Sequence, residues 1–254
     1  MNRIIGIAAL AALSCAPVAA GGAEPPRRVM VVLAHPDDEL TMAPALAAMA
    51  REGRAVTIVY ATAGDQGPGV TGLARGPQLG AVRRKEAQCA ARALGAEARF
   101  MEGLGDGTLA DTPQAPGASA AQFVSQFAAD YVAIDPQLVL TWGPDGGYGH
   151  GDHRMVSALV SQAMQSLDGP YRARLLYVGI PAGRLPPMPQ MATWAETDPR
   201  LLTDSVRYTP ADLAAAKAAA ACHVTQFDET TRMGMMTLFD ATMWQGRVHF
   251  RPAF

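Results

Sequence analysis

Two short polar clusters contain the residue types that hold metal ions. In the first, His35, Pro36, Asp37, Asp38 and Glu39 directly follow an apolar run. Crowded carboxylates repel one another, and a divalent cation relieves that repulsion. The proline restricts its own backbone and that of the preceding histidine, so the turn is stiff enough to hold ligands. The alternative interpretation is that the acids only cap a helix N-terminus, which would explain one or two of them.

The second cluster is the segment Tyr148 to His153, with the sequence YGHGDH. His150 and His153 are three positions apart and would share one face of a helix that begins there. Alone, the pair is also typical of surface histidines beside a capping Asp152. Two imidazoles and a carboxylate, however, form a common catalytic zinc set with one position open to water. Together, the two clusters predict one metal site, with Zn2+ expected and another divalent metal as the alternative.

The apolar pattern places both clusters at strand ends. Strands are predicted at 28–33, 55–61, 98–101, 138–142 and 175–180. Helices are predicted at 40–52, 80–94, 119–134, 153–167, 210–224 and 230–244, with Pro44 delaying or bending the first and Ser119 capping the third. This alternation indicates an α/β fold: a single Rossmann-like domain whose mostly parallel sheet has helices on both faces. Ligands of such folds bind at the carboxyl ends of strands, where both clusters lie.

The N-terminus has the pattern of a secretory signal. Arg3 precedes an apolar run over 4–13, and small residues follow before position 21. We therefore expect residues 1–20 to be a signal peptide and 21–254 to be the domain of an exported, periplasmic or secreted protein. Lipoprotein anchoring at Cys15 is the less favoured alternative. No later segment has the roughly 20 apolar residues of a membrane span, so none is expected after signal removal.

The composition excludes several classes of protein. The chain has 254 residues, of which 49% are hydrophobic and 17% are charged, which excludes a disordered tail or a disulfide-stapled miniprotein. The formal net charge of −2 becomes −3 when Arg3 is removed with the signal. A nucleic-acid binder normally carries a basic patch, so no nucleic-acid partner is expected.

Cys89 and Cys222 would remain in the exported chain. An oxidising compartment would allow them to pair. Each also lies in an apolar helical pattern that is typical of a buried free thiol, and this interpretation is favoured although the sequence leaves the question open. The neighbouring His223 lies in an Ala-rich helical pattern and is expected to be structural rather than a ligand.

The two clusters carry a family resemblance. AHPDDE at 34–39 and GHGDH at 149–153 resemble the signature motifs of the LmbE-like, or PIG-L, zinc-dependent N-deacetylases. Weaker similarities occur at 62–67, 82–86, 103–107 and 217–226. Gly151, Ala63 and Asp65 replace residues that are frequent in the family. None of these changes removes a proposed ligand, but the changed loop at 62–67 leaves substrate preference open.

The resemblance implies a metal set and a base. Zinc would be bound by His35, Asp38 and His153, and Asp37 would be the unligated general base. This agrees with the chemistry, because zinc lowers the pKa of its bound water to about 7 and a free carboxylate beside it can accept the proton.

Further roles follow from the chemistry of amide hydrolysis and from the positions of the residues, with the resemblance suggesting Tyr148. His150 would stabilise the oxyanion, with Tyr148 as a helper. Either Asp37 or His150 could protonate the leaving amine, and the sequence does not separate these roles. Arg83 and Asp106 would contact the substrate, although Arg83 could instead pair with a glutamate on its own helix and Asp106 could be a turn residue.

The predicted function is a zinc-dependent hydrolase that removes an N-acyl group, with N-acetyl favoured, from a small-molecule amino sugar or glycoconjugate. The alternative is a non-catalytic metal- or glycan-binding exported protein on the same fold, which the presence of Asp37 and both histidines of the second cluster disfavours. A dinucleotide-binding oxidoreductase is weaker still, since the turn after the first strand is not Gly-rich.

Overall fold

The computed structural model describes residues 28–111, 115, 117–167 and 173–254. The predicted signal peptide at 1–20, with Cys15, lies outside the described residues, and the predicted domain span of 21–254 stays a prediction. Within the described part of the chain, every helix is too short or too polar to cross a membrane.

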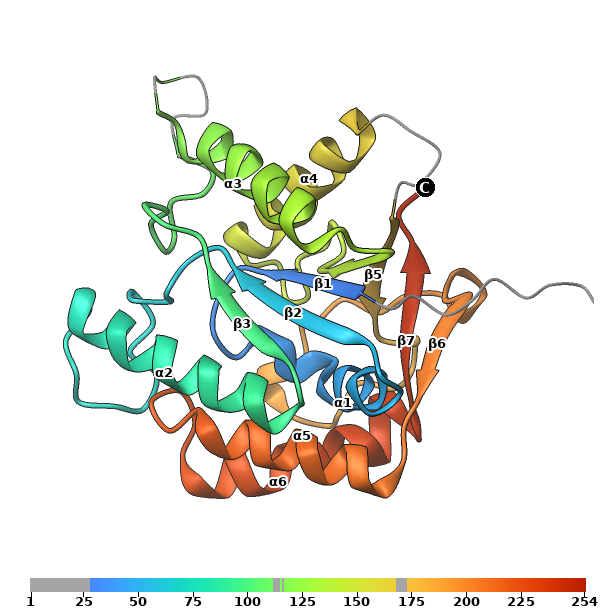
Figure 1. The fold of residues 1–254 in the computed structure, drawn as a ribbon. Coiled ribbons are helices and arrows are strands. Elements are labelled where there is room, and N and C mark those ends of the chain that lie inside the picture. Colours follow the sequence, from blue (N-terminus) through green and yellow to red (C-terminus); the bar gives the residue numbers. More distant parts are fainter. Residues whose placement is uncertain (1–27, 112–114, 116, 168–172) are drawn as a thin grey trace, which may run out of the picture.

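One sheet organises the described residues (Figure 1). Its strands are β1 (Arg28–Leu33), β2 (Ala55–Tyr60), β3 (Glu97–Phe100), β4 (Leu138–Thr141), β5 (Arg174–Gly179), β6 (Asp204–Arg207) and β7 (Arg247–Pro252). The order across the sheet is β3-β2-β1-β4-β5-β7-β6. The first five strands are parallel, whereas β7 runs antiparallel to both of its neighbours. The predicted α/β class with a mostly parallel sheet is confirmed.

The last two strands correct the sequence prediction, which ended the sheet at β5. In β6, the polar sequence DSVR alternates between half-buried and exposed residues. In β7, only Val248 and Phe250 are buried, between arginines and a histidine. Antiparallel strands near a sheet edge bury one face and show this alternation instead of the continuous apolar run of a central parallel strand. Because these two strands are short and rich in charged residues, the apolar pattern of the sequence does not reveal them.

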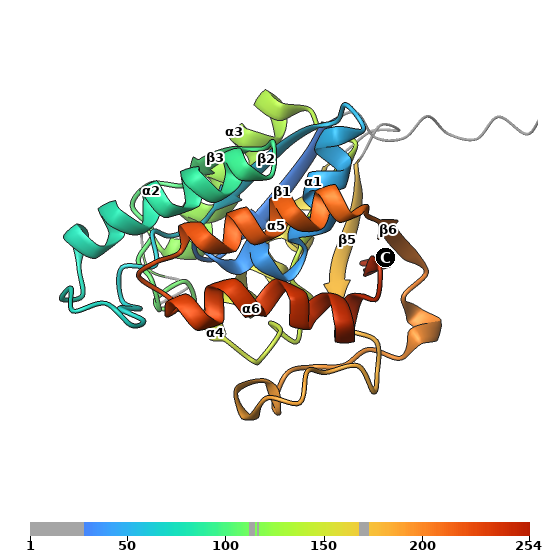
Figure 2. The ribbon, with the colours of Figure 1, turned by 90° about the horizontal axis from the view of Figure 1, so that it is seen from below.

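Helices cover both faces of the sheet (Figures 1 and 2). One face carries α1 (Ala43–Arg51), α2 (Pro77–Ala93), α5 (Pro210–Cys222) and α6 (Glu229–Phe239), and the other carries α3 (Ser119–Ile134) and α4 (Gly151–Ser166). In β1, Val29 and Val31 pack in the core beneath the first set, while Met30 and Val32 pack beneath the second. Burial on both faces explains why this strand is continuously apolar.

Several helices begin or end at other residues than the sequence predicts. A short 3-10 turn over Asp38–Thr41 precedes α1, which begins late with Pro44 in its first turn, as expected. The capping position of α3 is occupied by Ala118, so Ser119 is the first helical residue and not the cap. The predicted C-terminal helix ends its α-helical part at Phe239 and continues as a π-helical turn.

Cys89 of α2 and Cys222 at the end of α5 form a disulfide. The favoured interpretation of two free thiols was therefore wrong. The two helices pack against each other on the same face of the sheet, and this brings the two helical cysteines within bonding distance. Such proximity depends on tertiary packing and leaves no trace in the local pattern.

Candidate metal centre

The two polar clusters meet at the carboxyl edge of the sheet. The first follows β1 directly, and the second lies between β4 and α4. These strands are neighbours, with Val31 of β1 opposite Leu140 of β4. Parallel neighbours end at the same edge, so residues 118 positions apart in the chain come into contact. Nδ1 of His35 lies 3.3 Å from Nε2 of His153.

The hydrogen bonds of His35 leave one ring nitrogen free to bind a metal. Its Nε2 lies 2.9 Å from Asp106 Oδ1 and 3.2 Å from Asp152 Oδ2. Carboxylates accept hydrogen bonds, so in the neutral ring Nε2 carries the proton and Nδ1 keeps its lone pair. A carboxylate behind a ligating histidine also fixes the ring and raises its basicity. Burial opposes protonation of His35, but these carboxylates and Asp38 raise its pKa to about 10.

His153 is oriented in the same manner from the opposite side. Its Nδ1 donates to the Gly146 carbonyl oxygen at 3.1 Å, which leaves the Nε2 lone pair directed at His35. The ring stacks on the indole of Trp142, with centroids 4.5 Å apart and planes 7° apart. The side chain is 1% exposed, so packing holds the nitrogen in place.

Asp38 supplies an oxygen to the same point. Its Oδ2 accepts hydrogen bonds from the backbone N–H groups of Ala34 and His35 at 3.0 Å and from Trp142 Nε1 at 3.1 Å. Its Oδ1 faces His153 Nε2 at 3.1 Å. Burial raises the pKa of this carboxyl, but the two histidines more than offset burial and hold the pKa well below its usual value. Asp38 is therefore an anion with one oxygen available.

Two of the three ligand separations match a tetrahedral zinc ion. Bonds of about 2.0–2.1 Å at tetrahedral angles place ligand atoms about 3.3 Å apart. The imidazole nitrogens are 3.3 Å apart, and His153 Nε2 lies 3.1 Å from Asp38 Oδ1. His35 Nδ1 lies 4.0 Å from the other oxygen of Asp38, Oδ2. Two imidazole lone pairs that face each other beside a carboxylate repel unless a cation lies between them. The site therefore fits a divalent cation.

His150 is a competing third ligand, because its ring lies in the same cluster as His35 and His153. However, its Nδ1 accepts a hydrogen bond from the Asp152 backbone N–H at 3.2 Å, as the N-cap of α4. The neutral ring therefore carries its proton on Nε2, which makes it a hydrogen-bond donor. Burial and the neighbouring histidines lower its pKa, which keeps the ring neutral. Tyr148 lies against it, with ring centroids 5.7 Å apart, and is 43% exposed.

Asp37 lies beside the three ligand atoms in a strained backbone conformation. Its φ of 98° is in the left-handed region, which a non-glycine residue adopts only at a cost. This backbone conformation directs the two consecutive carboxylates to different partners. Asp38 contacts His153, whereas Asp37 bonds to Arg83. Burial raises the pKa of the Asp37 carboxyl to about 6, against the opposing charge of Arg83. A carboxylate with this pKa can accept a proton at neutral pH.

Arg83 is 3% exposed, and its guanidinium already has protein partners. It donates to the carbonyl oxygens of Gly64 at 2.5 Å and Pro36 at 2.6 Å, and to Asp37 Oδ2 at 3.2 Å. A Cβ at position 64 would lie 2.2 Å from Arg83 Nη1, so only glycine fits there. The alternative pairing with Glu86 of the same helix is not seen, because that carboxylate accepts from Thr225. Substrate contact by Arg83 stays a prediction.

Asp106 lies behind His35 rather than in an open rim loop. Its Oδ2 accepts from the Gln66 backbone N–H at 2.7 Å, while Oδ1 faces the imidazole. Burial raises its pKa, but the hydrogen bond with His35 outweighs burial and lowers it, so it is an anion. Its contact with substrate, like that of Arg83, stays a prediction. Asp152 also contacts His35 Nε2 and helps to orient the ring. Its Oδ2 accepts a hydrogen bond from the Gly107 backbone N–H at 2.7 Å.

A buried pair behind Asp37 was not predicted as part of the site. Glu39 and His223 are both 0% exposed, and His223 Nε2 lies 2.5 Å from Glu39 Oε1. Glu39 Oε2 accepts from Tyr60 and from the Asp37 backbone N–H. The prediction of a structural His223 agrees with this position. One sequence signal could have revealed this pair. Glu39 is the third acid of the first cluster, and helix capping explains only one or two of these acids.

The comparisons with known proteins place the chain in a family. Residues 30–164, more than half of the chain, match the PIG-L family, described as GlcNAc-PI de-N-acetylase. The chain therefore belongs to the PIG-L family.

Curated relatives are deacetylases of an amino sugar. The 1D-myo-inositol 2-acetamido-2-deoxy-alpha-D-glucopyranoside deacetylase of Nakamurella multipartita is 39% identical over 164 residues, 56% of this chain and 56% of that protein. The enzyme of the same name from Rhodococcus erythropolis is 36% identical over 157 residues, 55% of this chain and 53% of that protein. The chain thus spans little more than half the length of these relatives.

Solved structures share the fold. The N,N'-diacetylchitobiose deacetylase from Pyrococcus horikoshii has a TM-score of 0.65 at 19% identity, covering 90% of this chain and 84% of that chain. A 4-carboxy-2-hydroxymuconate hydratase from Pseudomonas putida has a TM-score of 0.61 at 17% identity, with 90% and 96% covered. One fold thus serves two different reactions, so the fold alone does not define the chemistry.

Proposed function

We propose that the protein is a zinc-dependent hydrolase that removes an N-acyl group, with N-acetyl first among the candidates, from an amino sugar or glycoconjugate. The observation that carries the proposal is the position of His153 Nε2, 3.3 Å from His35 Nδ1 and 3.1 Å from Asp38 Oδ1, next to the Asp37 carboxylate, which bonds to Arg83. Membership of the PIG-L family and the deacetylase relatives support the same reaction.

The metal would be held by His35, Asp38 and His153. Two imidazoles and one carboxylate are a common catalytic set for zinc, which favours zinc over the harder cations that prefer oxygen ligands. When bound, such an ion supplies Lewis acidity toward the amide carbonyl and makes water a better nucleophile at neutral pH.

Asp37 would act as the general base. It accepts a proton from the attacking water as the oxygen bonds to the amide carbon. The carbon–nitrogen bond then breaks, and the departing nitrogen needs a proton to leave as an amine. Asp37 must lose the proton it gained before the next turnover. We therefore assign it the return of that proton to the amine, which regenerates the base. The second proton of the water stays on the carboxylic acid product, which then ionises in solvent.

His150 and Tyr148 would stabilise the oxyanion that forms during attack. The Asp152 N–H occupies Nδ1 of His150, so the proton of the ring is on Nε2 and can be donated. A fixed donor of this kind stabilises developing negative charge. Tyr148 is partly exposed, so its hydroxyl is accessible from solvent. Burial raises the pKa of this hydroxyl, which keeps it protonated and able to donate.

We also propose that the protein is exported, in the periplasm or outside the cell. The disulfide between Cys89 and Cys222 supports this, because such bonds persist in oxidising compartments and are rare in the cytosol. Intact-mass measurement of protein from its native host would test the proposal: loss of residues 1–20 is expected, and a full-length cytosolic chain would contradict it.

The function is tested by measuring metal content and the release of acetate and primary amine from N-acetylated glucosamine derivatives. We expect turnover by zinc-loaded protein and its loss in Asp37→Asn, with the metal retained. The alternative, a non-catalytic metal- or glycan-binding protein, predicts binding without turnover. Full activity of His35→Ala after exhaustive metal removal would refute the mechanism.

A further inference from the structure

A large cavity opens next to the proposed metal site. Its volume is about 700 Å³, within the range of small-molecule sites. Asp37, Asp38 and Tyr148 line it, so it is continuous with the reacting centre. An acetyl group would fill only a small part of it. The cavity therefore has room for a much larger part of a substrate.

Most of the surface inside this cavity is apolar, and a large part of its wall comes from two segments after β5. The loop between β5 and β6 contributes Met188, Met191 and Trp194, and α6 contributes Met235 and Leu238. Methionine and tryptophan side chains present apolar surfaces that adapt to alkyl and aryl groups. Both segments lie outside residues 30–164, the part that matches the family. This part of the wall therefore belongs to the chain's C-terminal part, while the side next to the proposed metal site lies within the family match.

The charge of the lining limits what can occupy the cavity. Its charged side chains, among the described residues that line it, are the acids Asp37, Asp38 and Asp228, and no lysine or arginine is among them. A phosphate or carboxylate group would therefore meet like charge with no cation to pair with. A neutral group fits this lining, and an anionic one does not.

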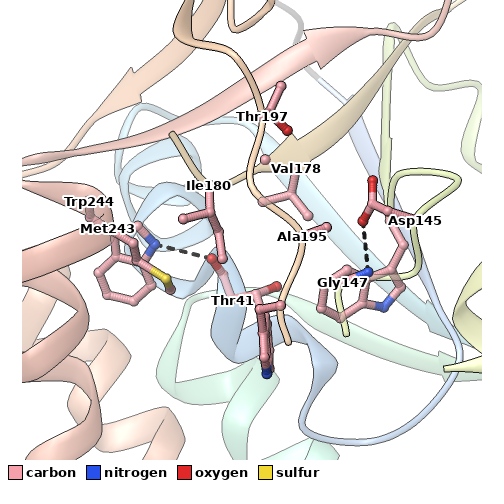
Figure 3. A pocket seen from close by; sticks show the side chains of 12 residues that line it. Thr41, Asp145, Gly147, Val178, Ile180, Ala195, Thr197, Met243 and Trp244 are labelled. Carbon is pink, nitrogen blue, oxygen red and sulfur yellow. Dashed lines mark hydrogen bonds between the residues drawn. The ribbon is translucent and has the colours of Figure 1, made fainter. Parts of the chain in front are cut away.

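A second, smaller cavity does not compete for this role. It has a volume of about 20 Å³, room for about one water molecule. Figure 3 shows Thr41, Asp145 and Met243 around it, with the Trp244 indole bonded to the Thr41 carbonyl oxygen and the Gly147 N–H bonded to Asp145. These bonds hold the walls together. Of these two cavities among the described residues, the larger one has room for a substrate group.

We propose that the large cavity binds a neutral alkyl or aryl group of the substrate, several carbon atoms or more in size, while the amide lies at the metal site. The inference rests on the proposed function and names its substrate class: apolar, uncharged N-acyl amino sugars rather than phosphate-linked ones. The group is either the N-acyl chain or the aglycone, since both extend from the reacting amino sugar.

The test compares two substrate series on zinc-loaded protein. One series lengthens the acyl chain from N-acetyl to N-octanoyl glucosamine, and the other adds an octyl aglycone to N-acetylglucosamine, with an octyl phosphodiester aglycone as the charged control. We expect kcat/KM to rise by about threefold per buried methylene in the series that reaches the cavity, and to fall when the phosphate is added.

A plug variant links the gain to the cavity. Gly234 of α6 lines it, and a Cβ built there meets no atom within 4 Å, so Gly234→Phe adds bulk without a backbone clash. We expect the variant to lower the ratio of kcat/KM for octyl over plain substrate by at least about tenfold. The matched control is Met233→Phe, because Met233 is on the same helix, 67% exposed and outside the cavity lining. It should leave the ratio unchanged.

A binding measurement separates failure of this inference from failure of the proposed function. Trp142 and Trp194 line the cavity, so an octyl glycoside should change tryptophan fluorescence of metal-free protein, and Gly234→Phe should abolish the change. Turnover of N-acetylglucosamine without any gain from octyl groups, and without a fluorescence change, would overturn the inference and leave the function standing. No turnover of any substrate would refute the function, and the fluorescence titration would then decide the cavity's ligand.

Discussion

His35 Nδ1 and His153 Nε2 lie 3.3 Å apart, and each ring donates its other N–H away from this gap. Both lone pairs therefore face one position, where a proton and a metal ion compete. Burial opposes protonation of His35, but Asp106, Asp152 and Asp38 raise its pKa to about 10, so the metal-free ring binds a proton at this position.

Metal affinity should therefore increase with pH. His35 binds a proton throughout the neutral range in the metal-free protein, and metal binding must release it. We expect the Kd for zinc to fall by about tenfold per pH unit between about pH 6 and 8, for one proton released. Calorimetry in buffers of different ionisation enthalpy counts the released protons. Affinity that does not change with pH would contradict this arrangement of the two rings.

Asp37→Asn should abolish most turnover but keep the metal. The amide has nearly the shape of the carboxylate but cannot accept the proton of the attacking water, so kcat should fall by about 10²- to 10⁴-fold. Metal content, measured by atomic absorption, should equal that of the unchanged protein, because Asp38 and the histidines are intact. Substantial activity in this variant would assign the base to another group.

The same carboxylate predicts an acidic limb in the pH profile. Asp37 must be ionised to act, so kcat/KM should fall as pH decreases through the pKa of about 6. A bound cation favours the carboxylate and moves the midpoint to or below this value. Initial rates between about pH 4.5 and 8 measure the limb. A rate that rises toward acidic pH would show that a protonated group is required instead.

Arg83→Lys separates positioning from substrate contact. Lysine has a single ammonium and cannot reproduce the bonds to Gly64, Pro36 and Asp37. We expect unfolding free energy to fall by about 1–3 kcal/mol, from unpaired buried carbonyls, and kcat to fall with little change in KM. Urea unfolding and steady-state kinetics measure these effects. A rise in KM with unchanged kcat would instead support the predicted contact with substrate.

Reduction of the disulfide should destabilise the protein. The bond joins Cys89 to Cys222 across 133 positions, and cross-links that close long loops restrict the unfolded chain most. We expect unfolding free energy to fall by about 2–4 kcal/mol on reduction. Urea titration with and without reductant measures the change. The double variant Cys89→Ala, Cys222→Ala is the control, since reductant should not change its stability.

The sequence predicted the parts of the site that local pattern controls. The AHPDDE turn follows an apolar strand directly, and the alternation of strands and helices implies that β1 and β4 end at one edge. This placed the two clusters together, and the resemblance to the PIG-L deacetylases supplied the proposed ligand set of His35, Asp38 and His153. The strained backbone that separates Asp37 from Asp38 could not, because it depends on the bonds that surrounding residues make.

Features that depend on distant packing were missed or misjudged. Cys89 and Cys222 pair because α2 and α5 pack together, and Arg83 reaches Asp37 because Gly64 leaves space for its guanidinium. The strands β6 and β7 were not predicted because their alternation is short and rich in charge. In each case the decisive neighbour is far away in the chain.

The proposed ligands and the later part of the cavity wall come from different stretches of the polypeptide. The proposed ligands and base lie between residues 35 and 153, whereas Met188, Trp194 and α6 add wall residues after position 164. Under the proposed function, we expect exchange of the later stretch to redirect hydrolysis toward a different aglycone or acyl chain while the proposed ligands stay in place. Selectivity and rate could then be engineered through separate parts of one polypeptide.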